Sequence, residues 1–194
     1  LGDVYKRQLH NFARYSFDGG KNYTLIGESS NLTAEHLADV WRKLAREFKD
    51  YNNIWGYDIM NEPYSMHPSA PWVNIAQVVI NAIREVDTET PIIVCGDSFS
   101  SARFWVEYSD NLRTLVDPSD NLIFQAHLYF DKDYSGQYLN SYDADGVTAN
   151  TGVERAKYFV EWLKRYNKRG LLGEYGVPVS YTHLRAHETS QDLV

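Results

Sequence analysis

The stretch that decides the fold is IWGYDIMNEP, residues 54–63. Its first seven residues form a mostly apolar run that is typical of a buried strand, and Glu62 follows in a loop. A second short run, GLLGEYG at residues 170–176, presents Glu174 in the same way. Two glutamates, each at the carboxyl end of a strand and several strand–helix units apart, are typical of an enzyme that cleaves glycosidic bonds.

Apolar runs alternate along the chain with segments of helical periodicity. Apolar side chains three or four residues apart predict a helix over 33–51, with Thr33 as its N-cap. A similar stripe predicts a helix over 153–167, with four side chains facing inward: Val153, Ala156, Val160 and Leu163. The other expected elements are helices over 71–86 and 102–115 and strands ending near residues 12, 60, 96, 127 and 174.

This alternation favours an α/β fold with a parallel sheet. An open nucleotide-binding sheet would carry a glycine-rich loop after a strand, and the sequence contains no such motif. Polar residues instead follow four of the strands: His10 and Asn11, Asn61 and Glu62, His127 and Tyr129, and Glu174. Because (β/α)8 TIM barrels place their catalytic groups at the carboxyl ends of strands, we expect that architecture.

Composition narrows the expected partners. The net charge of −7 argues against nucleic acid, and no apolar run approaches the length of a membrane span. The single cysteine, Cys95, lies in an apolar run and is expected to be a small buried hydrophobe. Fifteen tyrosines and five tryptophans suit both cores and sugar faces. The candidates for sugar-binding aromatics are Phe12, Tyr15, Tyr64, Trp105 and Tyr129.

The two ends of the chain do not share the pattern of the rest. Residues 1–8 and 179–194 resemble translated adapter sequence, so we expect both to be non-native tails flanking a catalytic segment over 9–178. His183 and His187, four residues apart, could mimic a helical metal pair, but they lie in the second tail and are discounted. The natural protein is then expected to continue in both directions.

Glu62 and Glu174 fit retaining glycoside hydrolysis, which needs one protonated and one ionised carboxyl group about 5–5.5 Å apart. One carboxyl donates a proton to the leaving oxygen, and the other attacks the sugar and forms an ester. Asn61 could donate a hydrogen bond to a sugar 2-hydroxyl, and His127 and Tyr129 could orient the carboxylates. This chemistry requires no metal or cofactor.

The motifs over residues 9–178 together resemble glycoside hydrolase family 5, the cellulase-like barrels. The similar blocks are HNFARY at 10–15, WGYDIMNEP at 55–63, HLY at 127–129 and GE at 173–174. The resemblance implies a partial (β/α)8 TIM barrel with about strands 3 to 7 present. It also implies that Glu62 is the acid/base and Glu174 the nucleophile, with five residues binding substrate: His10, Asn11, Asn61, His127 and Tyr129.

The resemblance further implies a secreted endo-β-1,4-glucanase, extracellular or periplasmic, that acts on plant-type polysaccharide and is monomeric at full length. Two family features have no counterpart here: the strand-two arginine that supports the nucleophile and the strand-eight tryptophan beneath the sugar. Arg14 lies in a different block and does not replace that arginine. We therefore expect the 194-residue chain itself to show little or no hydrolase activity.

Three alternatives remain open. Within the family, the substrate could be β-mannan, mixed-linkage glucan or xyloglucan. A different class is a GDSL-type esterase, since residues 91–100 contain Gly96-Asp97-Ser98, but no histidine has an aspartate three residues before it. A third reading is a carbohydrate-binding fragment without turnover, because a barrel lacking three strands has an open edge and an incomplete core.

Overall fold

The computed structural model describes residues 5–177. Its main sheet has five strands: β1 (Tyr5–Gln8), β4 (Ile54–Asp58), β5 (Ile92–Cys95), β6 (Leu122–Tyr129) and β7 (Arg169–Gly176). The strands are parallel and lie in the order β1-β4-β5-β6-β7. A parallel sheet whose spatial order follows the chain order is the arrangement of a (β/α)8 barrel, and a doubly wound sheet would reverse direction. The predicted partial barrel is confirmed.

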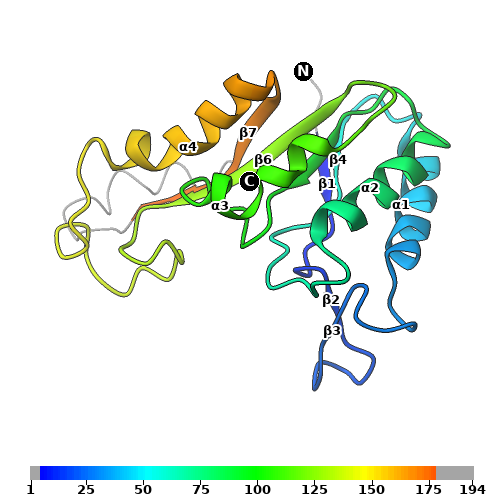
Figure 1. Ribbon diagram of the computed structural model, residues 1–194, viewed down its shortest axis with the longest axis horizontal. Coiled ribbons are helices and arrows are strands. Elements are labelled where there is room, and N and C mark those ends of the chain that lie inside the picture. Colours follow the sequence, from blue (N-terminus) through cyan, green and yellow to red (C-terminus); the bar gives the residue numbers. More distant parts are fainter. Residues whose placement is uncertain (1–4, 178–194) are drawn as a thin grey trace.

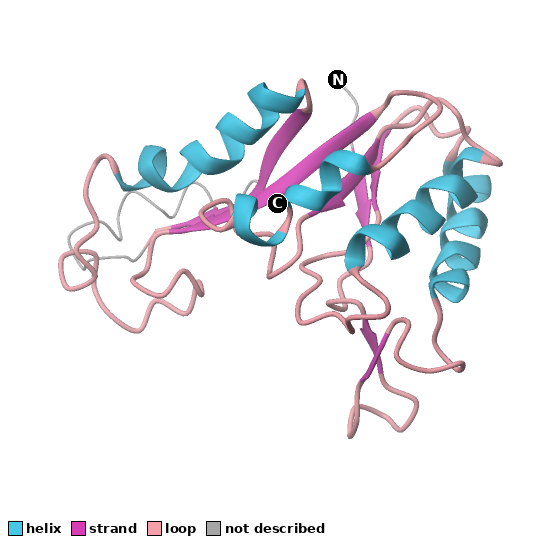
Figure 2. Cartoon of the chain, viewed as in Figure 1, coloured by secondary structure: helices cyan, strands magenta, loops and turns pink. Residues whose placement is uncertain are grey.

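Within residues 5–177, four helices accompany the sheet: α1 (Ala34–Phe48), α2 (Trp72–Arg84), the single turn α3 (Trp105–Tyr108) and α4 (Thr151–Tyr166). A 3-10 helix, η1 (Asp110–Thr114), follows α3, so the helix expected over 102–115 is broken into two short pieces. Figure 1 shows α1 and α2 side by side at one end of the sheet and α4 at the other end, beside β7. Long loops extend beyond the carboxyl ends of the strands (Figure 2).

Helix α1 begins as the sequence predicts and fixes the end of β4. Thr33 caps it in a capping box with His36, and the buried face carries Leu37, Ala38, Trp41 and Ala45. The Trp41 indole N–H donates to the carbonyl of Ile59 at 2.9 Å. This bond satisfies a buried indole and anchors the backbone three residues before Glu62.

The inward face predicted for α4 is half correct: Ala156 and Leu163 pack against the core, but the other two residues do not. Val153 and Val160, expected to point inward, are 73% and 38% exposed, while Phe159 and Trp162 are buried. Trp105 packs between these two rings, with centroid distances of 4.4 Å to Phe159 and 5.5 Å to Trp162. Trp105 is therefore a core residue and was wrongly considered as a sugar-binding ring.

The amino-terminal edge of the sheet includes residues expected to lie in a tail. The backbone of Tyr5–Gln8 pairs with β4, and Leu9 continues the ladder through its N–H to Asp58. Backbone pairing depends little on side-chain identity, so the non-native origin of residues 1–8 stays a prediction although 5–8 belong to the sheet. The other tail, residues 179–194 with His183 and His187, lies outside the described residues.

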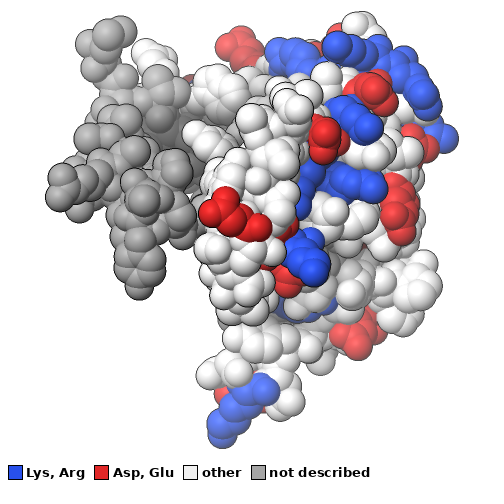
Figure 3. Space-filling model, turned by 90° about the vertical axis from the view of Figure 1, so that its left-hand side faces the viewer, with Lys and Arg blue, Asp and Glu red and all other residues white. Residues whose placement is uncertain are grey.

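A small hairpin of β2 (Arg14–Tyr15) and β3 (Thr24–Leu25) projects from the loop that follows β1 (Figure 1). No helix among residues 5–177 is long and apolar enough to cross a membrane. On the face drawn in Figure 3, acidic and basic side chains of the described part are interspersed instead of forming one basic surface.

Candidate active site

Glu62 follows a completely buried segment that begins at the end of β4. Asp58, Ile59, Met60 and Asn61 are each at most 1% exposed. Glu62 then adopts a left-handed backbone conformation with φ of 44°, which is unfavourable for a residue with a side chain. Such strain is of order 1–3 kcal/mol and is found mainly where a side chain must be aimed. The Glu62 side chain keeps 15% exposure.

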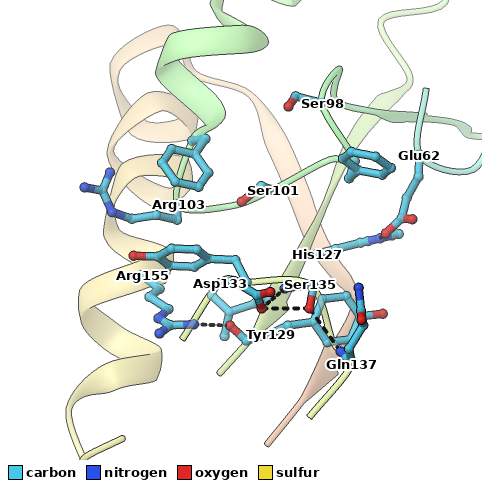
Figure 4. A pocket seen from close by; sticks show the side chains of 14 residues that line it. Glu62, Ser98, Ser101, Arg103, His127, Tyr129, Asp133, Ser135, Gln137 and Arg155 are labelled. Carbon is cyan, nitrogen blue, oxygen red and sulfur yellow. Dashed lines mark hydrogen bonds and ion pairs between the residues drawn. The ribbon is translucent and has the colours of Figure 1, made fainter. Parts of the chain in front are cut away.

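The Glu62 carboxylate meets His127 of β6. His127 Nδ1 lies 2.5 Å from Glu62 Oε1, and the His127 side chain is 1% exposed. Figure 4 shows the two side chains pointing toward one another from separate segments of the chain. Since the histidine ring is almost fully buried, the hydrogen bond is shielded from water and holds Glu62 in one orientation.

A bulge in β7 brings Glu174 to the same place. Ala126 pairs with Leu172, but His127 pairs with Glu174, so Gly173 is an extra residue in β7. A bulge turns the strand locally and re-aims the next side chain. As a result, Glu174 Oε2 lies 3.6 Å from His127 Nδ1.

Tyr129 supports Glu174. Its hydroxyl donates to Glu174 Oε2 at 2.5 Å. Burial, and then the hydrogen bond to the Glu174 carboxylate, raises the pKa of Tyr129 above its ordinary value of 10.0, so the phenol stays a donor at neutral pH. Gly136, at φ of +73°, lets the loop close against the Tyr129 ring, where an added Cβ would lie 2.9 Å from the ring.

The two carboxylates are close enough to act on one bond. Ligand atoms of Glu62, His127 and Glu174 all lie within 4.8 Å of one another. Retaining glycosidases place their carboxyl groups about 5–5.5 Å apart, and inverting enzymes about 6.5–9.5 Å apart. The same three groups could also hold a metal ion, since histidine and carboxylates are common ligands.

The remaining predicted site residues differ in their placement. Asn61 is 1% exposed, and within the described part neither polar atom of its side chain has a hydrogen-bond partner. The side-chain oxygen of Asn11 is also buried without a partner there. His10 is exposed and contacts Phe12, with ring centroids 5.5 Å apart, and within the described part it is not brought to the carboxylates. Buried amides without partners are costly unless something else satisfies them.

A cavity of about 330 Å³ opens beside Glu62 and His127 (Figure 4). Its walls come from the segment after β5, the loop after β6 and helix α4, and they include Ser98, Phe99, Ser101, Arg103, Phe104, Asp133, Tyr134, Ser135, Gln137 and Arg155. Tyr64 stacks on Phe99 at 4.1 Å and extends the aromatic rim. Trp105 is absent from this lining, whereas Tyr129 belongs to it.

Sequence reasoning missed three supporting residues. Arg155 of α4 donates to the carbonyls of Tyr129 and Asp131 and lies over the Tyr134 ring at 4.1 Å. Asp131 is 3% exposed and accepts from Gly136 and from the hydroxyl of Ser135, which shapes the loop. Gln125 lies two residues before His127 and contacts it. The period-two spacing of Gln125, His127 and Tyr129 was the one signal that could have identified Gln125.

Comparison with known proteins assigns the family. The sequence model described as Cellulase (glycosyl hydrolase family 5) matches residues 9–192. The chain belongs to glycosyl hydrolase family 5. Endo-beta-1,4-glucanase B of Aspergillus niger is 33% identical over 166 residues, which cover 86% of this chain and 45% of that protein.

Solved structures of the family agree with the fold. Endoglucanase Cel5A of Pseudomonas stutzeri is 43% identical with a TM-score of 0.79, over 89% of this chain and 51% of that one. The endo-beta-1,4-glucanase Xac0029 of Xanthomonas axonopodis pv. citri is 31% identical with a TM-score of 0.78, over 97% and 60%. The chain therefore spans about half the length of these family 5 relatives.

Proposed function

We propose that the protein is a retaining endo-β-1,4-glucanase in which Glu62 is the acid/base and Glu174 the nucleophile. The observation that carries the proposal is the approach of the two carboxylates to within 4.8 Å, each with a different partner. Glu62 is held by His127, and Glu174 is held by Tyr129. Two carboxyl groups in different surroundings are suited to opposite protonation states.

In the first step, Glu174 attacks the anomeric carbon of the bound glucan. Glu62 gives its proton to the glycosidic oxygen, so the leaving chain departs as an alcohol and the sugar becomes esterified to Glu174. His127 occupies Oε1 of Glu62, which leaves Oε2 to carry the proton toward the leaving oxygen. Tyr129 donates to Oε2 of Glu174, so Oε1 is the oxygen free to attack.

In the second step, Glu62 acts as a base. It takes a proton from water, the hydroxide attacks the anomeric carbon of the ester, and Glu174 leaves as a carboxylate. Two inversions at one carbon give net retention of configuration. The hydroxyl of Tyr129 stabilises the departing carboxylate, because hydrogen bonds to charged groups are stronger than those between neutral groups.

The buried amides and the cavity supply substrate contacts in this proposal. Asn61 donates to the 2-hydroxyl of the sugar at Glu174, and this contact would satisfy its unpartnered amide. His10 and Asn11 follow β1 and bind the same part of the glucan. The cavity lies beside the acid Glu62, so it receives sugars on the leaving-group side.

β-1,4-Glucan is the proposed polysaccharide, since the relatives named above are endo-β-1,4-glucanases and one solved Pseudomonas stutzeri Cel5A structure is a complex with cellobiose. We further propose secretion to the extracellular space or periplasm, a monomer at full length, and non-native tails over 1–8 and 179–194. Since the chain spans about half the length of its relatives, we expect the 194 residues alone to have little activity.

The test measures the anomeric form of the product. Residues 9–178 replace the matching segment of the Pseudomonas stutzeri endoglucanase, and proton NMR follows cellopentaose hydrolysis by this chimera. The expected first product is the β-anomer. Glu174→Gln in the chimera should abolish hydrolysis, and Glu62→Gln should slow it by about 10²–10⁴-fold, while circular dichroism shows an unchanged fold. An α-anomer product, or undiminished activity in either variant, would contradict the mechanism. Strong activity of the unmodified 194-residue chain would contradict the expectation for that chain.

A further inference from the structure

Gln125 contacts His127 at the ring nitrogen that does not face Glu62. It is 0% exposed, and its amide nitrogen Nε2 lies 3.2 Å from His127 Nε2. The same nitrogen donates to Cys95 Sγ at 3.0 Å. The amide –NH2 group has two hydrogens, which matches these two contacts.

The contact limits where His127 can carry its proton. An amide N–H is only a donor, so His127 Nε2 must be the acceptor. A neutral imidazole with an accepting Nε2 carries its hydrogen on Nδ1. That hydrogen then points at Glu62 Oε1, 2.5 Å away.

The charges around His127 oppose this state. Glu62 from β4 and Glu174 from β7 both approach Nδ1, at 2.5 and 3.6 Å, and two nearby carboxylates favour a positively charged imidazolium. On the other side, Cys95 of β5 lies between Gln125 and the buried Asp58. A positively charged His127 would need to donate from Nε2 as well, and the hydrogens of Gln125 occupy that direction.

We propose that Gln125 is a positioning residue that keeps His127 neutral, with its one hydrogen on Nδ1 and directed to Glu62. This inference rests on the proposed role of Glu62. A neutral His127 holds one oxygen of Glu62 in place by a hydrogen bond. It does not act as a second acid beside Glu62, as a charged imidazolium would. The leaving-group proton then comes from Glu62 itself.

The surrounding backbone is built to hold Gln125. A Cβ at Gly173 would lie 2.2 Å from Gln125 Oε1 and 2.3 Å from its Cδ, so only glycine allows β7 to pass this close. Gly173 is also the bulge residue that aligns Glu174 with His127. The carbonyl of Gln125 accepts from the Ser100 hydroxyl at 2.5 Å, and Ser100 in turn accepts from the N–H of Gly96. Ser100 therefore holds the backbone of Gln125, while its side-chain amide lies against Cys95 of β5, His127 of β6 and Gly173 of β7.

The test reads the two ring nitrogens of His127 by nitrogen-15 NMR in the 194-residue chain at pH 7, with the signals assigned by their loss in His127→Asn. The expected result is a protonated Nδ1 and an unprotonated Nε2. A protonated Nε2 in this spectrum, in the neutral or the charged ring, overturns the inference. This measurement needs no turnover, so its result is independent of the proposed function. The Glu62→Gln and Glu174→Gln variants test the proposed function.

Gln125→Glu is the discriminating variant, because it keeps the shape and replaces the donor by an acceptor. It should convert His127 at pH 7 from the neutral ring to one protonated on both nitrogens. Gln77→Glu on α2, away from the site, is the matched control and should leave the His127 signals unchanged. If His127 stays neutral with an unprotonated Nε2 in the Gln125→Glu variant, Gln125 does not set the protonation of His127. If the variant fails to fold, the spectrum of the unmodified chain still decides the inference.

Discussion

The two carboxylates of the site stand on strands with different surroundings. Glu62 follows β4, an interior strand whose last residues are buried and tied to α1 through Trp41, and its side chain is 15% exposed. Glu174 belongs to β7, the edge strand of the described sheet, and its side chain is 31% exposed. Its neighbours Leu172 and Tyr175 are 42% and 75% exposed.

This difference shows that the two groups are positioned by different physical means. Core packing and a strained turn fix Glu62. Among the described residues, Glu174 depends on its register with His127 and on the single hydrogen bond from Tyr129. Changes in the core should therefore act on Glu62, and changes in a few polar contacts should act on Glu174.

The largest expected effect separates the chemical roles of the two carboxylates in the chimera. Glu62→Ala should lower kcat/KM on cellopentaose by about 10²–10⁴-fold, the usual contribution of a general acid. On a dinitrophenyl cellobioside, Glu62→Ala should form the ester with Glu174 almost as fast as the unmodified chimera, because the dinitrophenolate leaving group needs no proton. Glu174→Ala should be inactive on both substrates, since no ester can form. Equal losses for both variants on the activated substrate would remove the distinction between acid and nucleophile.

The next effect concerns stability on the β4 side. Trp41→Ala removes a fully buried indole and its bond to Ile59, and should lower the free energy of unfolding by about 3–5 kcal/mol. Tyr175→Ala, on exposed β7, should change it by less than about 0.5 kcal/mol. Urea denaturation of the 194-residue chain measures both values. Similar losses for the two variants would contradict the difference in burial between Trp41 and Tyr175.

A smaller effect tests the polar support of Glu174. In the chimera, Tyr129→Phe removes one hydrogen bond to a charged group, so kcat should fall by about 10–100-fold, equivalent to about 1.5–3 kcal/mol. Because the pKa of Tyr129 is raised above 10.0, its hydroxyl stays protonated as pH rises through neutrality. The size of the loss should therefore be constant between about pH 5 and 8. A loss that changes across this range would show that another group titrates with Tyr129; Tyr142→Phe, in the loop after β6, is the matched control.

The sequence predicted the parts of the molecule that depend on local pattern. The cap at Thr33, the parallel alternation and the existence of strands before Asn61 and around Glu174 follow from short-range rules, although β4 ends at Asp58 and β7 runs past Glu174 to Gly176. The shared position of His127 and Tyr129 at the site could also be predicted from the sequence, because alternate residues of one strand lie on the same face.

The failures arose where tertiary contacts decide. Val153 and Val160 fit a helical stripe, but the larger rings of Phe159 and Trp162, on a neighbouring face of α4, bury more surface around Trp105. Gln125 shares the period-two spacing of His127 and Tyr129, but its contact partners could not be read from that spacing, since they depend on the bulge at Gly173 in another strand. Such pairings join distant parts of the chain and leave no local pattern.

The smallest expected effect is that of metal removal. A bound ion would tie Glu62, His127 and Glu174 to one centre and remove the difference between the two carboxylates. His127 Nδ1 faces Glu62 at 2.5 Å, and Glu174 Oε2 already accepts from Tyr129, so both atoms are engaged without an ion. Dialysis of the chimera against EDTA should therefore leave kcat and KM unchanged within error, with the parent Pseudomonas stutzeri enzyme treated alongside. Loss of activity that returns on adding a divalent cation would show that the three groups act as metal ligands instead of as an acid, its support and a nucleophile.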